Sequence, residues 1–180
     1  VNGIPVVAIE LKNQLTGQSV DDAMRQWEYN RNPKEYAFGF NKRVLAYFAC
    51  DLYNVYMTTQ LNGAETVFLP FNQGSNGAGK DGGAGNPTTE DGKYVTSYFW
   101  ENVLQKDKLL DILQKFISYE RSEKKKIMPD GSTKTTVSSK VIFPRYHQLD
   151  VVRKLVSHVR ENGAGHNYLI QHSAGSGKSN

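Results

Sequence analysis

The sequence predicts an α/β fold, in which strands and amphipathic helices alternate along the chain. Three observations support this prediction. An apolar, β-branched run is followed by a polar loop and by a helix start signal. Two later segments repeat apolar residues with the period of an α-helix. Near the end, a short apolar run leads directly into a glycine-rich turn, as a strand leads into a loop.

The first strand and the first helix are expected within residues 1–31. Val6 to Lys12 is apolar at first and then becomes polar, which is typical of a buried strand. Ser19 and Asp22 have the spacing of a capping box, so a helix is expected to begin there. This helix is expected to reach about Arg31, because the residue before Pro33 disfavours the helical conformation.

Residues 41–51 are predicted to form a second helix, because their apolar side chains fall on one helical face. Short β segments are expected at 55–59 and 66–69. The Asn62-Gly63 pair between them favours a hairpin. Residues 74–92 hold seven of the 16 glycines, a density that disfavours helix and strand alike, so a loop is expected there.

The second half of the chain is predicted to contain two further helices. Asp107 is expected to cap the first, whose apolar stripe extends to Ile117. A stripe over residues 147–159 predicts the second, ended by Gly163. Between these helices, the turn signal at 128–131 separates a lysine-rich arm from a Thr- and Val-rich arm.

Composition excludes several classes of protein. The chain has 180 residues, and its one cysteine excludes an internal disulfide framework and a cysteine-based zinc site. A reducing, cytoplasmic location fits best. The longest apolar run, 44–50, is too short to cross a bilayer, and no secretory signal precedes it. We therefore expect a cytoplasmic protein without a membrane partner.

The positive charge is concentrated in one segment. Residues 120–145 hold seven Lys or Arg and three Asp or Glu, and this difference of four equals the net charge of +4 for the whole chain. Such a segment suits a phosphate backbone, although a solvated linker explains the charge equally well. We place a domain boundary here, which divides the chain into 1–120, a basic linker at 121–140, and 141–180.

The last residues have the pattern of a phosphate-binding loop. A strand is expected at 167–171, and the chain then matches the end of G-x-x-x-x-G-K-[ST], with His172 at the position of the first glycine. In such a loop backbone N–H groups bind phosphate oxygens, Lys178 supplies positive charge and Ser179 binds Mg²⁺. The alternative is a chance glycine-rich tail. The residues assigned to nucleotide binding are Gly175, Ser176, Gly177, Lys178 and Ser179.

A second candidate site lies at the end of the first strand. Strand alternation places Glu10 and Lys12 on one face, about 6–7 Å apart along the chain. A carboxylate beside an ammonium group is suited to hold a divalent metal and position an attacking water. The alternative is an ordinary surface pair. The apolar run before the pair, and the following helix with Gln26 and Tyr29, favour a site.

These segments, taken in order, resemble the R subunit of type I restriction–modification enzymes. Ile9-Glu10-Leu11-Lys12-Asn13 and the helix after it resemble the later part of a PD-(D/E)xK nuclease. Arg145-Tyr146-His147-Gln148 is similar to the glutamine motif that reads adenine before a helicase core. Residues 171–179 resemble helicase motif I, and 83–87 and 99–100 are also similar to parts of this family.

The resemblance implies a fold and an activity. Residues 1–120 would form the C-terminal part of a PD-(D/E)xK nuclease core, a mixed sheet flanked by helices. Residues 141–180 would begin a RecA-like domain of a superfamily 2 helicase. The whole enzyme would use ATP and Mg²⁺ to translocate on and cleave double-stranded DNA. Its partners would be methylation and specificity subunits.

The resemblance also implies roles for single residues. Glu10 would bind Mg²⁺ together with an aspartate from a preceding strand. Lys12 would stabilise charge at the scissile phosphate or orient the water. Gln26 and Tyr29 would position the site or the DNA, and Gln148 would contact adenine. The family has a Gln-x-x-x-Tyr signature, and Gln26 and Tyr29 are one residue closer together than that signature requires.

We expect the chain to be a fragment of a longer protein. It begins within an apolar run without an initiator Met, and it stops in the glycine-rich turn. The aspartate expected before the Glu10 strand is not among its residues. A fragment of this kind is expected neither to cleave DNA nor to hydrolyse ATP by itself.

Two alternatives remain open at this point. The first is a P-loop DNA-dependent ATPase or helicase with a non-catalytic N-terminal module that binds DNA or a partner. In that case Glu10 and Lys12 would be a surface pair. The second is a non-enzymatic module that docks on a methyltransferase.

Overall fold

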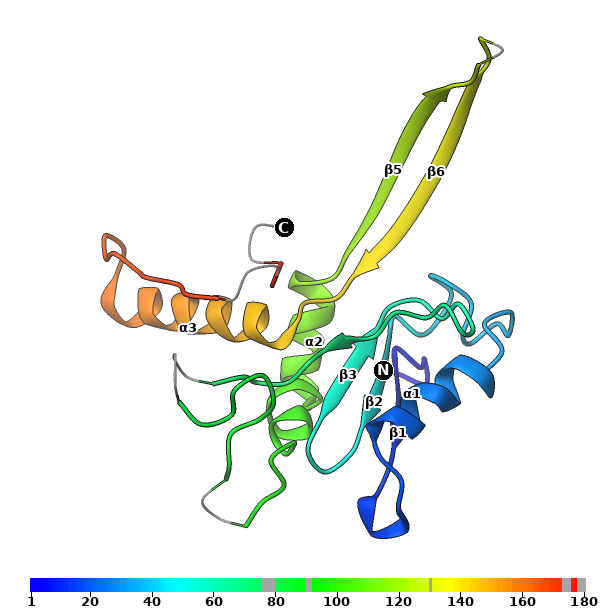
Figure 1. The fold of residues 1–180 in the computed structure, drawn as a ribbon. Coiled ribbons are helices and arrows are strands. Elements are labelled where there is room, and N and C mark those ends of the chain that lie inside the picture. The colour runs from blue at the N-terminus through cyan, green and yellow to red at the C-terminus, as the bar shows by residue number, and fades with distance from the viewer. Residues whose placement is uncertain (76–79, 90–91, 130, 173–175, 178–180) are drawn as a thin grey trace.

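The computed structural model describes residues 1–75, 80–89, 92–129, 131–172 and 176–177. Its strands form a four-stranded sheet in the order β1-β2-β3-β4 and a separate two-stranded ribbon, β5-β6. Figure 1 shows α1 beside the sheet and the ribbon extending away from it. The elements are β1 (Val7–Leu11), η1 (Gln14–Thr16), α1 (Val20–Tyr29), β2 (Ala46–Cys50), β3 (Val55–Thr58), β4 (Leu69–Pro70), η2 (Phe99–Val103), α2 (Lys106–Lys115), β5 (Ser118–Ile127), β6 (Thr133–Ile142) and α3 (Tyr146–Asn162).

The four-stranded sheet is mixed. β1 runs parallel to β2, and β2 and β3 are antiparallel, as are β3 and β4. Parallel neighbours need a crossover, and α1 lies within the connection between β1 and β2. The mixed α/β character predicted from the sequence is therefore confirmed.

β2 corrects the prediction of a helix over residues 41–51. All five of its residues are buried. Phe48 packs into a core on one side of the sheet, whereas Tyr47 and Ala49 pack into a second core on the other side. A strand that is covered on both faces needs no polar side, so its apolar run gives no alternation by which to distinguish it from a helix.

The first predicted strand is confirmed, but it is less buried than expected. Within the described residues β1 pairs only with β2, so it lies at the edge of the sheet. Ile9 and Leu11 are exposed. The alternation along β1 consequently directs Glu10 inward, where it is largely covered.

The first predicted helix is also confirmed. Ser19 caps α1, and the reciprocal bond from its backbone N–H to the Asp22 carboxylate measures 2.8 Å. The helix ends at Tyr29, slightly before the predicted end. Trp27 is buried, and its indole N–H donates to the carbonyl of Phe48 on β2 at 3.0 Å. This bond attaches α1 to the middle of the sheet.

The connections after β3 follow the predictions in part. β3 and β4 form the expected antiparallel pair, but the connection between them spans residues 59–68. The Asn62-Gly63 pair forms a local turn within that connection. The described residues of the 74–92 segment form no helix or strand, as predicted. Asn86 anchors this loop, donating to the carbonyl of Tyr53 at 2.8 Å.

Two predictions for the second half need correction. Gln105, rather than Asp107, caps α2, and its side chain accepts from the backbone N–H of Lys108 at 3.1 Å. Asp107 lies in the first turn, where its negative charge favours the helix dipole. No strand forms at 167–171, and Leu169 is exposed. A strand requires a pairing partner, and no described strand lies alongside this segment.

The basic segment has a regular structure. Most of 121–140 belongs to the β5–β6 hairpin, whose turn coincides with the predicted turn signal. After the hairpin, Phe143, Tyr146 and Leu149 pack with Phe71 in the first core. The predicted helix over residues 147–159 is confirmed as α3, which ends at Asn162 and is followed by Gly163 as its C-cap. The division into domains stays a prediction. None of the helices in the described ranges combines the length and apolar character needed to span a membrane.

Candidate functional site

Glu10 of β1 and Lys12, the residue directly after this strand, lie together on one side, as the strand alternation predicts. The Glu10 carboxylate and the Lys12 ammonium are 3.4 Å apart, and their side chains are only 16% and 11% exposed. An ordinary surface pair keeps both groups in water, where it contributes little to stability. Holding both charges out of water is costly, so this pair is more consistent with a functional cluster than with a surface contact.

Gln26 of α1 completes the cluster. The Lys12 ammonium donates a hydrogen bond to the Gln26 side-chain oxygen at 2.5 Å. Gln26 precedes Trp27, whose indole attaches the helix to β2. The capped helix and the buried indole therefore fix the position from which Gln26 reaches the strand.

Arg31 is a fourth member that the sequence analysis did not identify. Its guanidinium lies 3.3 Å from the second carboxylate oxygen of Glu10. It also lies 5.9 Å from the centroid of the Trp27 ring, a cation–π distance. Arg31 follows the end of α1, so no helical periodicity linked it to the site. Its only sequence signal was its nearness to the capped helix.

The cluster has a positive balance. One carboxylate, Glu10, is flanked by two cations, Lys12 and Arg31. The surplus charge favours an anion such as a phosphate group at the exposed side of the cluster. The Arg31 side chain is 37% exposed, so it lies on the side from which a ligand would approach.

Tyr29 is not brought to this cluster. It is 68% exposed at the end of α1. In the described ranges it has no hydrogen bond to Glu10, Lys12 or Gln26. Its predicted role therefore has no support from the geometry.

Glu10 is the group suited to a metal ion in this cluster. Within the described residues no three His, Cys, Asp or Glu side chains come together. Mg²⁺ is usually bound by one or two carboxylates, with water and substrate phosphates as its remaining ligands. One inward carboxylate beside a phosphate-attracting cluster fits this donor set.

The second predicted site is brought together in part. The Gln148 side chain donates to the carbonyl of Gly177 at 2.6 Å, and it accepts from the backbone N–H of Arg145 at 2.9 Å. A ring nitrogen of His147 lies 2.8 Å from the carbonyl of Ser176. The glutamine motif at the start of α3 thus contacts the glycine-rich turn. Gly175, Lys178 and Ser179 lie outside the described residues.

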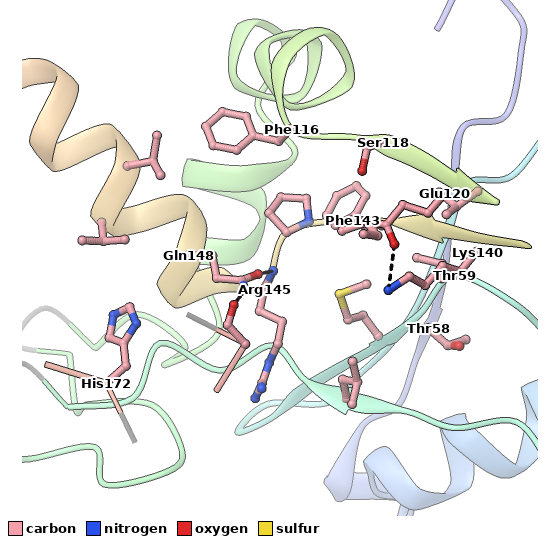
Figure 2. Close-up of a pocket in the computed structure, with 18 of the residues that line it drawn as sticks. Thr58, Thr59, Phe116, Ser118, Glu120, Lys140, Phe143, Arg145, Gln148 and His172 are labelled. Atoms are coloured by element: carbon pink, nitrogen blue, oxygen red, sulfur yellow. Dashed lines mark hydrogen bonds and ion pairs between the residues drawn. The ribbon is translucent and has the colours of Figure 1, made fainter. Parts of the chain in front are cut away.

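A cavity of about 800 Å³ adjoins this contact. Figure 2 shows Arg145, Gln148 and His172 at one side of it and the Glu120–Lys140 ion pair at another. Within the described part of the chain, Nε of Arg145 and Nδ1 of His172 are buried without hydrogen-bond partners. Unpaired polar atoms at a cavity wall favour a polar ligand.

His147 does not line this cavity but packs against His172, which does. Its ring centroid is 4.8 Å from that of His172. Burial lowers the pKa of His147, and the nearby charges of Arg145 and His172 lower it further, whereas the contact with the Ser176 carbonyl opposes this shift. Burial and the neighbouring cationic groups thus disfavour protonation of the His147 imidazole.

The comparisons with known proteins bear on the first site. Neither the search of curated proteins nor that of solved structures gave a match. Residues 1–74 match the family model described as "Type I restriction enzyme R protein N terminus". The matched part contains the strands β1 to β4, helix α1 and the Glu10–Lys12–Gln26 cluster. This part of the chain is therefore similar to the N-terminal region of type I restriction enzyme R proteins, and the match supports an R subunit of that kind.

Proposed function

We propose that this chain is part of the R subunit of a type I restriction enzyme, which cleaves double-stranded DNA in a Mg²⁺- and ATP-dependent reaction. The observation that supports this most is the Lys12–Gln26 contact beside Glu10, within the region similar to R proteins. It joins a strand and a helix that are separated in sequence into one partly buried, charged cluster.

Each member of the cluster has a proposed role. Glu10 would hold Mg²⁺ together with water and phosphate oxygens. When bound, the ion would act as a Lewis acid toward the scissile phosphate. The Lys12 ammonium would stabilise negative charge that develops there, or orient the attacking water. Gln26 would keep that ammonium in place through its hydrogen bond.

The second site is proposed to bind ATP. The contacts of His147 and Gln148 with the carbonyls of Ser176 and Gly177 support a shared site for the glutamine motif and the glycine-rich turn. Gln148 would contact adenine, while Lys178 would neutralise phosphate charge. Ser179 would bind the accompanying Mg²⁺, as in phosphate-binding loops generally.

The partners of the proposed enzyme follow from its class. They are double-stranded DNA and the methylation and specificity subunits of the same complex. We further propose a cytoplasmic location, where the unpaired Cys50 would stay reduced.

The decisive experiment separates the two sites in the intact protein. Lys12→Ala is expected to abolish DNA cleavage while DNA-stimulated ATP hydrolysis persists. Lys34→Ala is the matched control, because Lys34 is an exposed lysine outside the cluster. Loss of both activities in Lys12→Ala would make Lys12 a structural residue. Undiminished cleavage would show that Lys12 takes no part in cleavage, whereas ATP hydrolysis without any cleavage by the wild type would favour a P-loop ATPase with a non-catalytic N-terminal module.

A further inference from the structure

The β5–β6 hairpin is an exposed arm. Its strands pair continuously from Ser118 opposite Ile142 to Ile127 opposite Thr133. Every residue of β5 is exposed, and Figure 1 shows the arm leaving the rest of the molecule. At about 3.3 Å per residue, ten-residue strands give an arm of roughly 30 Å. An arm of this length with both faces in solvent contributes little to a hydrophobic core.

The outer half of this arm presents positive charge on one face. Alternation places Lys124, Lys126 and Lys134 on the same side, with Lys126 directly opposite Lys134. In the described ranges none of the three forms an ion pair. Like charges placed opposite each other destabilise a strand pair. An anionic ligand would relieve this repulsion.

The inner half of the arm differs. There Lys140 pairs with Glu120 at 3.0 Å, and Arg121 pairs with Glu123 at 3.2 Å. The cations near the base are thus compensated by acids of the hairpin itself. The uncompensated charge lies toward the tip, which is the part that extends farthest from the cores.

We propose that the lysine face of the hairpin binds the phosphate backbone of double-stranded DNA, with the ribbon lying along the major groove. The major groove of B-DNA is about 12 Å wide and admits a two-stranded β-ribbon. The arm length of roughly 30 Å is close to one helical turn, about 34 Å. Few apolar side chains lie along the outer arm, so the surface lacks the buried anchors of a protein interface.

This proposal rests on the proposed function in one respect, which is that the substrate is duplex DNA. It assigns a separate contact, remote in sequence from the Glu10 cluster. The alternative explanation of the lysines is protection of exposed strand edges against aggregation. That explanation predicts an effect on solubility and none on DNA binding.

The test compares two variants of the same hairpin with the same loss of charge. Lys124→Gln/Lys126→Gln removes uncompensated cations, whereas Arg121→Gln/Lys140→Gln removes paired ones. Binding of the full 180-residue chain to a fluorescent duplex of about three helical turns is measured without Mg²⁺ over a series of salt concentrations. The plot of log K against log salt has a negative slope, and each lost phosphate contact makes it less steep by about 0.9. We expect a decrease of about 1.8 for the outer pair and less than half of that for the inner pair.

A charge-conserving variant guards against a misfolded hairpin. Lys124→Arg/Lys126→Arg keeps both charges and is expected to retain the wild-type slope. An unchanged slope in Lys124→Gln/Lys126→Gln would overturn the proposal. An equal decrease in steepness in this variant and in Arg121→Gln/Lys140→Gln would also overturn it. Binding to polyglutamate, an acidic polypeptide, is measured in parallel. If Lys124→Gln/Lys126→Gln lost this binding while its DNA binding was unchanged, the proposal would be overturned in favour of an acidic protein partner. Cleavage is compared in the intact protein. If Lys124→Gln/Lys126→Gln binds and cleaves DNA there as the wild type does while Lys12→Ala fails to cleave, only the hairpin proposal fails.

Discussion

The ammonium of Lys12, directly after β1, donates a hydrogen bond of 2.5 Å to the side chain of Gln26 on α1. The same ammonium lies 3.4 Å from Glu10. Gln26 therefore acts on the proposed chemistry through Lys12, as a positioning residue. This relationship leads to the first prediction.

Replacing Gln26 should lower cleavage without unfolding the chain. Gln26→Leu removes the acceptor, so the ammonium is free to move, and a displacement of about 1 Å can cost up to ~100-fold in rate. Gln26→Glu retains an acceptor for Lys12 and should keep more of the activity. Cleavage rates and ATP hydrolysis are measured in the intact protein. Equal losses in both variants, or a parallel loss of ATP hydrolysis, would contradict the positioning role.

Arg31→Met is expected to lower the Mg²⁺ concentration required for half-maximal cleavage. Arg31 competes with a cation for one oxygen of Glu10, and a partly exposed ion pair contributes up to about 1 kcal/mol, or ~5-fold. A shift of up to roughly 5-fold to lower Mg²⁺ is therefore expected. Arg25→Met, an exposed change on α1, is the control. A shift to higher Mg²⁺ would show that Arg31 does not oppose metal binding.

Trp27→Phe should destabilise the fold. The substitution removes the indole N–H that donates to the Phe48 carbonyl, and a hydrogen bond of this kind contributes about 0.5–1.5 kcal/mol. The free energy of unfolding is measured with urea. Trp100→Phe is the matched control, because Trp100 is partly exposed and surface changes usually stay within about 0.5 kcal/mol. Equal effects of the two substitutions would contradict the proposed attachment of α1.

Acid should destabilise the chain through His147. Its folded-state pKa is lowered from 6.5, chiefly by burial, so the unfolded state binds the proton more readily. The contribution is fully present above pH 6.5 and is lost as the pH falls through the lower, folded-state pKa. The free energy of unfolding should therefore decline less steeply with acid in His147→Asn. An unchanged pH dependence of the free energy of unfolding in His147→Asn would contradict this account.

Cys50 should resist alkylation in the folded chain. Burial raises the pKa of its thiol to about 12, and Asp51 adds to the shift, so the reactive thiolate is scarce near neutral pH. Because Cys50 is the single cysteine, mass spectrometry of iodoacetamide-treated protein reports on β2 alone. Labelling should become rapid in denaturant. Rapid labelling under native conditions would mean that β2 opens readily.

Much of the first site could be predicted because its signals are local. The capping box at Ser19 fixed the start of α1, and strand alternation paired Glu10 with Lys12. The capping pattern and the apolar stripe predicted the helices but not which residue caps α2. Local patterns thus located two structural elements that together form the cluster.

The remaining features depend on tertiary contacts. The helix predicted over β2 was wrong because two cores, one on each face, remove the polar alternation of a strand. Arg31 joins the site only because Trp27 and Glu10 come together in space. The strand predicted at 167–171 had the right composition but no described partner with which to pair. Pairing and burial are properties of the whole chain, and no short window of sequence contains them.

The indole of Trp27 also has a consequence for control of the proposed enzyme. Trp27 adjoins Gln26 in sequence, so tilting this helix away from the sheet would break the indole bond and withdraw the amide from Lys12 in a single movement. A protein or nucleic acid that bound the outer surface of α1 and displaced it would then inhibit DNA cleavage without contacting Glu10 or Lys12. Detachment of the helix, rather than blockage of the Glu10 cluster, would inhibit the proposed enzyme.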